Sequence, residues 1–188
     1  NVILDPAEPV SFPVPAKGII EFHDVDFAYP DAQEDVLHDI SFKAEPGQVT
    51  AVIGSTGSGK STLINLLPRL FDVSKGKITL DGVDIRDVSQ KELRENISYA
   101  PQRGLLFSGT VRSNLLVGKI SATEEDMISA VEAAQAADFV FSDEKGLDTE
   151  IAQAGINLSG GQKQRLSIAR ALIKDSPVYI FDDSFSAL

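Results

Sequence analysis

The fold of this chain is indicated first by the stretch GSTGSGKST, residues 54–62. It matches the pattern G-x-x-x-x-G-K-[S/T], which marks a phosphate-binding loop when a strand precedes it and a helix follows it. Both are expected here, because the apolar run QVTAVIG predicts a buried strand and KSTLINLLPRLF has helical spacing. A plain glycine-rich turn is the alternative, but chance gives the pattern in only about 1% of chains of this length.

The residue types in this loop suit the binding of a phosphate group. Gly54, Gly57 and Gly59 allow the backbone to curl so that several N–H groups point at one anion. The helix that begins near Lys60 directs its positive dipole end at the same anion, and the Lys60 ammonium adds a full charge. Ser61 offers a hydroxyl to Mg²⁺. The residues expected to hold the nucleotide are Gly54, Ser55, Thr56, Gly57, Ser58, Gly59, Lys60, Ser61 and Thr62.

The stretch VYIFDD, residues 178–183, places two carboxylates at the end of an apolar strand. Alone, it would more simply be a strand that enters a polar turn. Together with the phosphate-binding loop it matches the acidic strand end of P-loop proteins. In that interpretation Asp182 holds Mg²⁺ and Asp183 orients the attacking water.

The rest of the chain predicts an α/β protein with a mainly parallel core sheet. Short alternating runs, GIIEFHDVDFAYP and VLHDISFKAEPGQ, predict an antiparallel layer near the N-terminus. Beyond residue 48 strands alternate with helices, which is typical of a parallel core. The helices are expected at residues 60–67, 90–96, 121–141 and 159–173.

Composition and charge exclude several classes of protein. The net charge of −11 argues against a broad nucleic-acid surface, which needs clustered Lys and Arg. The chain has no cysteine, so disulfides and thiolate metal sites are excluded. Its apolar runs stay far below the ~18 residues that span a bilayer, and a signal peptide is not visible.

A second glycine-rich helix start, LSGGQKQR at residues 158–165, narrows the class. Ser159 followed three residues later by Gln162 is a capping-box pattern, and Gly160 and Gly161 expose the backbone beside it. For these residues alone, a plain helix cap is the simpler interpretation. Between a phosphate-binding loop and an IFDD strand, however, the motif resembles the signature of the nucleotide-binding domains of ABC transporters.

The resemblance covers residues 18–188, and it implies ATP and Mg²⁺ as cofactors. It also implies that the signature residues contact the γ-phosphate of an ATP molecule that the phosphate-binding loop of a second ATPase domain holds. Two domains would therefore enclose two ATP molecules head to tail. The signature residues concerned are Ser159, Gly160, Gly161 and Gln162.

Further residues match the same family. Gln102 in SYAPQ resembles the Q-loop glutamine, which contacts Mg²⁺ and responds to the membrane domain. Tyr29 in FAYP resembles the aromatic residue that stacks on adenine, and SAL at 186–188 resembles the start of the D-loop. The implied catalytic set is Lys60, Gln102 and Asp183, and the implied metal set is Ser61, Gln102 and Asp182.

The resemblance also divides the chain into four parts. Residues 1–17 are proline-rich and match a linker from an upstream membrane domain, and residues 18–101 would form the ATP-binding core with its antiparallel layer. Residues 102–158 would form the Q-loop and a helical subdomain, and residues 159–188 the signature helix, the acidic strand and the start of the D-loop. Because the family's switch histidine lies beyond the D-loop, the chain is expected to be truncated at its C-terminal end.

The stretches PQRGLLFSGTVRSNLL and DTEIAQAGINLSGGQ resemble ABC exporters. The expected function is an ATP-hydrolysing domain, itself soluble, that powers export at the cytoplasmic face of the cell membrane. Its partners would be a second ATPase domain and the transmembrane domain of the same transporter, and not nucleic acid. An importer ATPase subunit is an alternative. The DNA-handling ABC ATPases need a long coiled-coil insertion, for which residues 103–157 are too few.

Asp183 departs from the family pattern, in which glutamate is usual. Aspartate is one methylene shorter, which draws the carboxylate back by roughly 1–1.5 Å. A misplacement of that size can cost on the order of 10²-fold in rate. This resembles the degenerate half of heterodimeric exporters, so a heterodimer is favoured over a homodimer. A low-turnover nucleotide clamp is therefore the second function left open.

Overall fold

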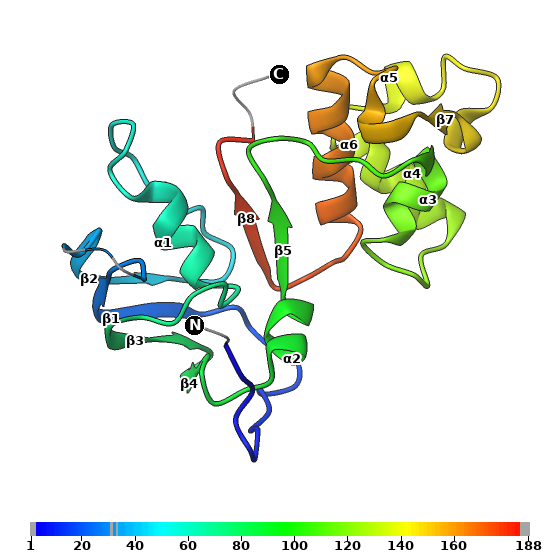
Figure 1. Cartoon of the computed structure of the whole chain (residues 1–188). Helices are drawn as coiled ribbons and strands as arrows, with labels where there is room; N and C mark the ends of the chain where they lie inside the picture. The colour runs from blue at the N-terminus through cyan, green and yellow to red at the C-terminus, as the bar shows by residue number, and fades with distance from the viewer. Residues whose placement is uncertain (1–2, 31, 33, 185–188) are drawn as a thin grey trace. The chain divides into compact units, whose positions relative to one another are not determined.

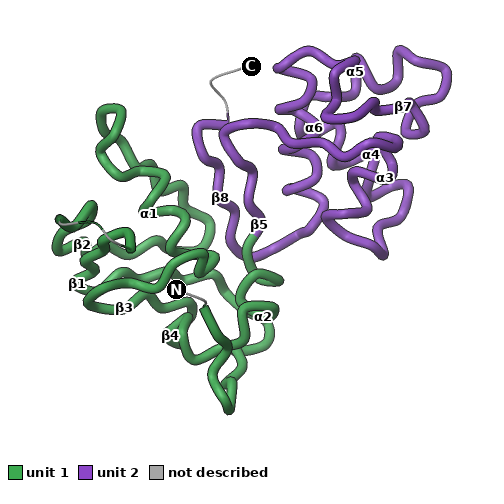
Figure 2. Tube along the Cα trace, viewed as in Figure 1, with its two compact units in different colours: residues 1–97 green, residues 98–188 purple. Residues whose placement is uncertain are grey.

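The computed structural model describes residues 3–30, 32 and 34–184, and it divides into two compact units, residues 1–97 and 98–188 (Figures 1 and 2). Each unit is described by itself. The D-loop start predicted at residues 186–188 lies outside the described residues, as do the first two residues of the predicted linker.

The first unit is built on an antiparallel sheet with the strand order β2-β1-β3-β4. Phe22 of β1 stacks on Phe42 of β2 with ring centroids 4.5 Å apart. A bulge at Asp24, whose φ is 46°, shifts the register so that Phe22 and Val25 are both buried. The predicted antiparallel layer is therefore present. Its strands are β1 (Ile20–Phe27), β2 (Leu37–Ala44), β3 (Lys75–Leu80) and β4 (Val83–Asp84).

Two short helices lie in the same unit, α1 (Lys60–Leu66) and α2 (Gln90–Glu95). As the sequence predicts, α1 ends just before Pro68. The described residues 3–17 carry no helix or strand, but they lie against the unit. Phe12 is only 4% exposed, and its N–H donates to Glu92 Oε1 at 2.9 Å.

The strand predicted for QVTAVIG, residues 48–54, is not formed. This stretch pairs with none of the described strands of the first unit, and Val49 and Ile53 are 98% and 91% exposed. The prediction rested on apolar residues at consecutive positions, which suit a strand covered on both faces. Such a strand needs partners on either side, and the four-stranded sheet of this unit provides none for it.

In the second unit the signature helix α6 (Gly160–Leu172) packs against α3 (Val111–Leu116) and α4 (Glu124–Ala133). Its core includes Leu115, Val131, Leu166 and Ala169, each at most 1% exposed. Two strand pairs complete the unit, β5 (Ile97–Ala100) with β8 (Val178–Phe181) and β6 (Gly109–Thr110) with β7 (Glu150–Ile151). Short 3₁₀ turns lie at Gly146–Asp148 and Gln153–Gly155.

The helix predicted over residues 121–141 is in fact two, α4 and α5 (Ala137–Val140). Gln135 takes a left-handed φ of 54°, the Ala136 N–H donates to Val131 O at 2.9 Å, and the Gln135 N–H donates to Glu132 O at 2.9 Å. This is the Schellman arrangement that ends a helix. None of the helices in the described part of the chain is long and apolar enough to cross a membrane.

Candidate functional site

The predicted phosphate-binding loop closes on itself through Lys60. The Lys60 Nζ donates to the carbonyl oxygens of Gly54 and Ser55, each at 2.8 Å. The Ser58 N–H also donates to Ser55 O at 3.2 Å, which tightens the turn. An ammonium group has three N–H donors, so these contacts orient Lys60 into the loop without using its full capacity.

Two glycines of the loop are required by its geometry. Gly59 has a φ of 86°, and a Cβ there would lie 2.9 Å from Leu37 Cδ2. Gly57 has a φ of 83°, in the left-handed region that favours glycine, whereas a Cβ at Gly54 would only displace the Ser58 hydroxyl, 2.5 Å away. Residues 54–58 are exposed, which leaves this side of the loop accessible to an anion.

Helix α1 begins directly after the loop at Gly59, which is its N-cap. Among the described residues no side chain caps this end, and the first turn holds no acidic residue. The first backbone N–H groups of a helix have no partner inside the helix, and they carry the positive end of its dipole. This helix start is therefore suited to a phosphate, with the exposed Ser61 in its first turn.

Tyr29 is held beside the same helix. Its hydroxyl forms a hydrogen bond with Thr62 Oγ1 at 2.9 Å, and its ring packs edge-on against Phe27 and Phe71. The side chain stays partly exposed, which leaves ring surface for a planar group. Thr62 is buried, and its hydroxyl faces Tyr29, so this residue of the predicted set fixes the aromatic side chain. The structure thus brings together Tyr29 and the phosphate-binding loop.

In the second unit the predicted metal ligand Asp182 is oriented by Tyr99. The Tyr99 Oη donates to Asp182 Oδ2 at 3.1 Å, and the Asp182 N–H donates to Ala100 O at 3.0 Å. Burial and the Asp182 charge raise the pKa of Tyr99 to about 12, so the phenol stays protonated and donates. Sequence reasoning missed Tyr99. The available signal was its place on a strand, ISYA, that ends as the VYIF strand does.

The structure also brings Gln102 and Asp183 together. Gln102 Nε2 donates to Asp183 Oδ2 at 3.3 Å, which joins two members of the predicted catalytic set. Strand β8 ends at Phe181, so both carboxylates follow the strand, and Asp183 takes a left-handed φ of 46°. Aspartate tolerates that conformation better than most residues do.

The signature motif forms the capping box that the sequence predicts. Ser159 Oγ accepts a hydrogen bond from the Gln162 N–H at 3.2 Å, and Gln162 Oε1 accepts one from the Ser159 N–H at 2.9 Å. A Cβ added at Gly160 would meet no described atom within 4 Å, so the helix start is open on that side. Within this unit the motif is a helix cap with an exposed backbone.

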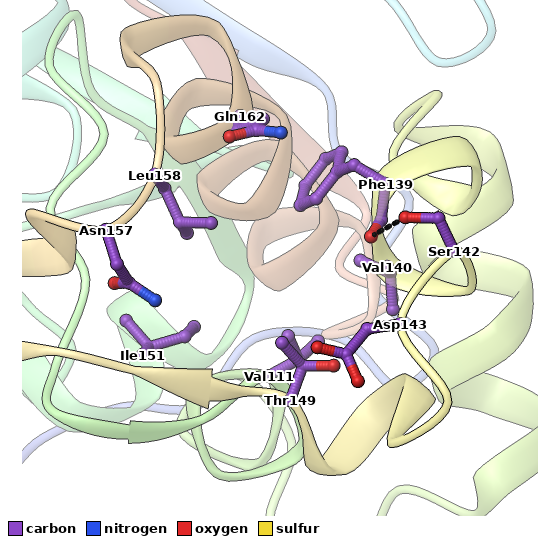
Figure 3. Close-up of a pocket in the computed structure, with 10 residues that line it drawn as sticks. All are labelled: Val111, Phe139, Val140, Ser142, Asp143, Thr149, Ile151, Asn157, Leu158 and Gln162. Carbon is purple, nitrogen blue, oxygen red and sulfur yellow. Dashed lines mark hydrogen bonds between the residues drawn. The ribbon is translucent and has the colours of Figure 1, made fainter.

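A cavity of about 410 Å³ lies beside the signature motif (Figure 3). Leu158 and Gln162 of the motif form part of its wall, and Asp143 and Thr149 add polar groups (Figure 3). Ser142 Oγ donates to Phe139 O at 3.0 Å on the opposite wall (Figure 3). Of the predicted site residues only Gln162 lines this cavity, so it is distinct from the phosphate-binding loop.

Each unit presents an oxygen donor of a kind that suits Mg²⁺. Within the described residues no three His, Asp or Glu side chains gather into a protein-only metal site. Mg²⁺ is commonly held by one or two carboxylates together with phosphates and water. Asp182 and the Ser61 hydroxyl, each in its own unit, are oxygen donors of that kind.

These geometries define the class of protein. A glycine loop closed by a lysine, followed at once by an uncapped helix, is the phosphate-binding device of P-loop nucleotide-binding proteins. The chain belongs to the ABC transporter family, because the model of that family, described as ABC transporter, matches residues 37–186. The predicted class, an α/β P-loop ATPase of the ABC type with an N-terminal antiparallel layer, is confirmed.

Individual relatives are exporters or parts of exporters by name. The chain is 47% identical over 174 residues to the ATP-dependent lipid A-core flippase of Desulfotalea psychrophila, with 93% of this chain and 30% of the relative covered. It is 49% identical over 172 residues to the beta-(1→2)glucan export ATP-binding/permease protein NdvA of Rhodopseudomonas palustris, with 92% and 28% covered. The chain therefore spans about 30% of the length of these curated relatives.

The fold is also similar to a solved structure described as that of a bacterial Atm1-family ABC exporter with ATP bound. The TM-score is 0.92 at 36% sequence identity, and the match covers 99% of this chain and 32% of that chain.

Proposed function

We propose that this chain is the ATP-binding and ATP-hydrolysing part of an ABC exporter. The observation that carries the proposal is Lys60, which closes the glycine loop onto Gly54 and Ser55 at the open end of α1. Membership of the ABC transporter family and the exporter names of the relatives support it. The adenine would stack on Tyr29, and the phosphates would lie on residues 54–62.

In this proposal the side chains near the phosphates divide the work, and Gln102 has two roles. Lys60 neutralises the charge on the β- and γ-phosphates, and Ser61 and Asp182 hold Mg²⁺ with the help of Gln102. The magnesium ion supplies further neutralisation of phosphate charge when it is bound. Asp183 orients the attacking water, and Gln102 holds the Asp183 carboxylate in place. Tyr99 keeps the Asp182 carboxylate turned in one direction.

The chain would work with partners in the membrane. Relatives about three times as long include a permease part by name, which supports a transmembrane domain in the same transporter. Two ATPase domains would meet at the cytoplasmic face of the membrane, where Ser159 and its glycines would contact the ATP of the opposite domain. Lipid A-core and glucan are named for different relatives of similar identity, so they give no basis for choosing a substrate.

The test is MgATP binding and hydrolysis by the complete transporter that carries this chain. Lys60→Ala should weaken MgATP binding roughly 10- to 100-fold, as expected for the loss of a hydrogen bond to a charged group. Lys91→Ala is the matched control, because Lys91 has an 86% exposed side chain on α2, remote in sequence from the loop. Equal MgATP affinity of Lys60→Ala and wild type in calorimetry would overturn the proposal.

A second candidate function is a nucleotide clamp with low turnover in a heterodimeric exporter. Asp183 favours it, because its side chain is one methylene shorter than that of the usual glutamate. In a clamp, ATP would hold the two domains together, and most hydrolysis would occur at the other composite site. The Asp183→Glu variant discussed below separates the two functions.

A further inference from the structure

Residues 101–105, here called the Q-loop segment, lie directly on the signature helix α6 within the second unit (Figure 1). Gln164 Nε2, from the second turn of α6, donates to Pro101 O at 2.9 Å. Gln164 is only 2% exposed, although glutamine is usually a surface residue. A buried polar side chain whose amide donates to one backbone carbonyl holds that carbonyl in place.

Gly104 provides an independent sign of the same contact. A Cβ at Gly104 would lie 2.5 Å from Lys163 O and 2.8 Å from Gln164 N. The backbone of the Q-loop segment therefore touches the backbone of α6 at the very residue whose side chain holds Pro101. Further along the helix, Arg170 Nη2 donates to Leu105 O at 2.8 Å.

The Pro101 carbonyl is also reached from the acidic strand end. Ser184 is fully buried, and its Oγ donates to Ala100 O at 2.7 Å with a longer contact of 3.4 Å to Pro101 O. The next residue, Gln102, donates to Asp183 Oδ2. Gln164 and Ser184 hold Pro101, the residue before Gln102, and these contacts therefore fix the direction of the Gln102 side chain.

We propose that Gln164 is a positioning residue, which fixes the Q-loop segment on α6 so that Gln102 reaches Asp183. This inference rests on the proposed function for its effect on hydrolysis. Because α6 starts at the Ser159 cap, one helix would set both the signature motif, which serves the opposite ATP, and the Q-loop glutamine, which serves the domain's own ATP. Movement of α6 would then change both sites together.

The first experiment measures the contact without any turnover of ATP. Gln164→Met keeps the length of the side chain and removes the donor, and Gly104→Ala pushes the same contact apart from the other side. Cleavage by trypsin after Arg103, an exposed residue within the Q-loop segment, should become roughly tenfold faster in both variants of the complete transporter, because the segment opens locally. Ser167→Ala is the control, because Ser167 is buried in α6 and its hydroxyl has no hydrogen-bond partner among the described residues.

The second experiment asks whether Gln164 acts through Gln102. Gln164→Met should lower kcat for ATP roughly tenfold, since small misplacements of catalytic groups cost that much or more, and change KM less than about twofold. In a Gln102→Ala background the same change should cost less than about twofold, because the residue that it positions is gone.

An unchanged rate of cleavage after Arg103 in Gln164→Met would overturn the proposal. So would a full tenfold loss of kcat in the Gln102→Ala background, because Gln164 would then act elsewhere. If the wild-type transporter neither binds nor hydrolyses MgATP, the proposed function fails instead, and the cleavage experiment still decides whether Gln164 holds the Q-loop segment.

Discussion

In the proposed function, Asp183 is the residue that decides how fast this chain's own site hydrolyses ATP. Its Oδ2 accepts a hydrogen bond from Gln102 Nε2 at 3.3 Å, and its backbone is left-handed with a φ of 46°. Asp is enriched in that conformation, whereas longer side chains are less frequent there. The backbone therefore suits the aspartate, while the proposed chemistry asks for a carboxylate that extends further.

We expect Asp183→Glu to raise the rate of single-turnover ATP hydrolysis at this chain's own site. The added methylene moves the carboxylate by roughly the length of one bond, and regained alignment is worth up to about 10²-fold in rate. The measurement uses the complete transporter with the other composite site disabled. Asp183→Asn is the control for the loss of the carboxylate and should reduce hydrolysis below wild type.

A rate for Asp183→Glu equal to or below that of wild type, in protein that still binds MgATP, would contradict this prediction. Aspartate would then not be what limits the site, and the clamp function would lose its main support. A large gain in rate would instead show that the phosphate-binding loop, Gln102 and Asp182 are otherwise competent for hydrolysis.

Among the helices and strands, the sequence predicted the features that depend on nearby residues or on a simple alternation of apolar and polar residues. The Ser159–Gln162 capping box, the end of α1 before Pro68 and the antiparallel first layer are all present. Each depends on residues close in sequence or on an alternation that one sheet can satisfy. The sequence also assigns Gln102 and Asp183 to one catalytic set, and the structure shows a hydrogen bond between them.

The features that the sequence missed have no signal in the types of the neighbouring residues. The break between α4 and α5 uses Gln135 in the left-handed conformation, where glycine is the usual signal. The apolar run at residues 48–54 predicts a strand only if neighbours cover both of its faces. Tyr99 and Gln164 acquire their roles from partners 83 and 63 residues away, which no local pattern records.

The Tyr99–Asp182 bond joins the ends of β5 and β8, and it makes stability depend on pH at the alkaline end. Burial and the Asp182 charge raise the pKa of Tyr99 from 10.0 to about 12. A group whose pKa is raised by folding stabilises the protein fully below its ordinary pKa, and this stability is lost as pH rises through the folded value. The free energy of unfolding should therefore fall between pH 10 and about 12.

Tyr99→Phe should reduce this alkaline loss, because phenylalanine has no proton to release. The measurement is the free energy of unfolding in urea, for wild type and Tyr99→Phe, between pH 10 and about 12. Tyr29→Phe serves as the control, since it removes a phenol from the other unit and should keep the fall seen in wild type. If Tyr99→Phe and wild type lose the same free energy of unfolding, burial beside Asp182 does not raise the pKa of Tyr99.

For the whole molecule, the proposed function brings two ATPase domains together, and the chain spans about 30% of the length of its curated relatives. The signature helix start is exposed, and Gly160 faces open space within its own unit. If Ser159 serves the ATP of a second domain, each composite site takes its phosphate-binding loop from one domain and its signature from the other. A change in the loop and a change in the signature should then damage both composite sites when one chain carries both. When each chain carries one of them, both changes should fall in the same composite site.

Ser159→Arg is expected to prevent this chain's signature from closing on the ATP of the second domain and to leave ATP binding by Lys60 nearly intact, because the bulky cation fills the open helix start. Placed in this chain with Lys60→Ala, it should damage both composite sites and abolish hydrolysis. Placed in this chain with the equivalent lysine change in the partner domain, both changes fall in one site, and about half of the hydrolysis of two equal sites should remain. The opposite pattern in steady-state ATPase assays would show that Ser159 acts on its own domain's ATP. Ser159→Thr, which retains the helix cap, controls for damage to α6 itself.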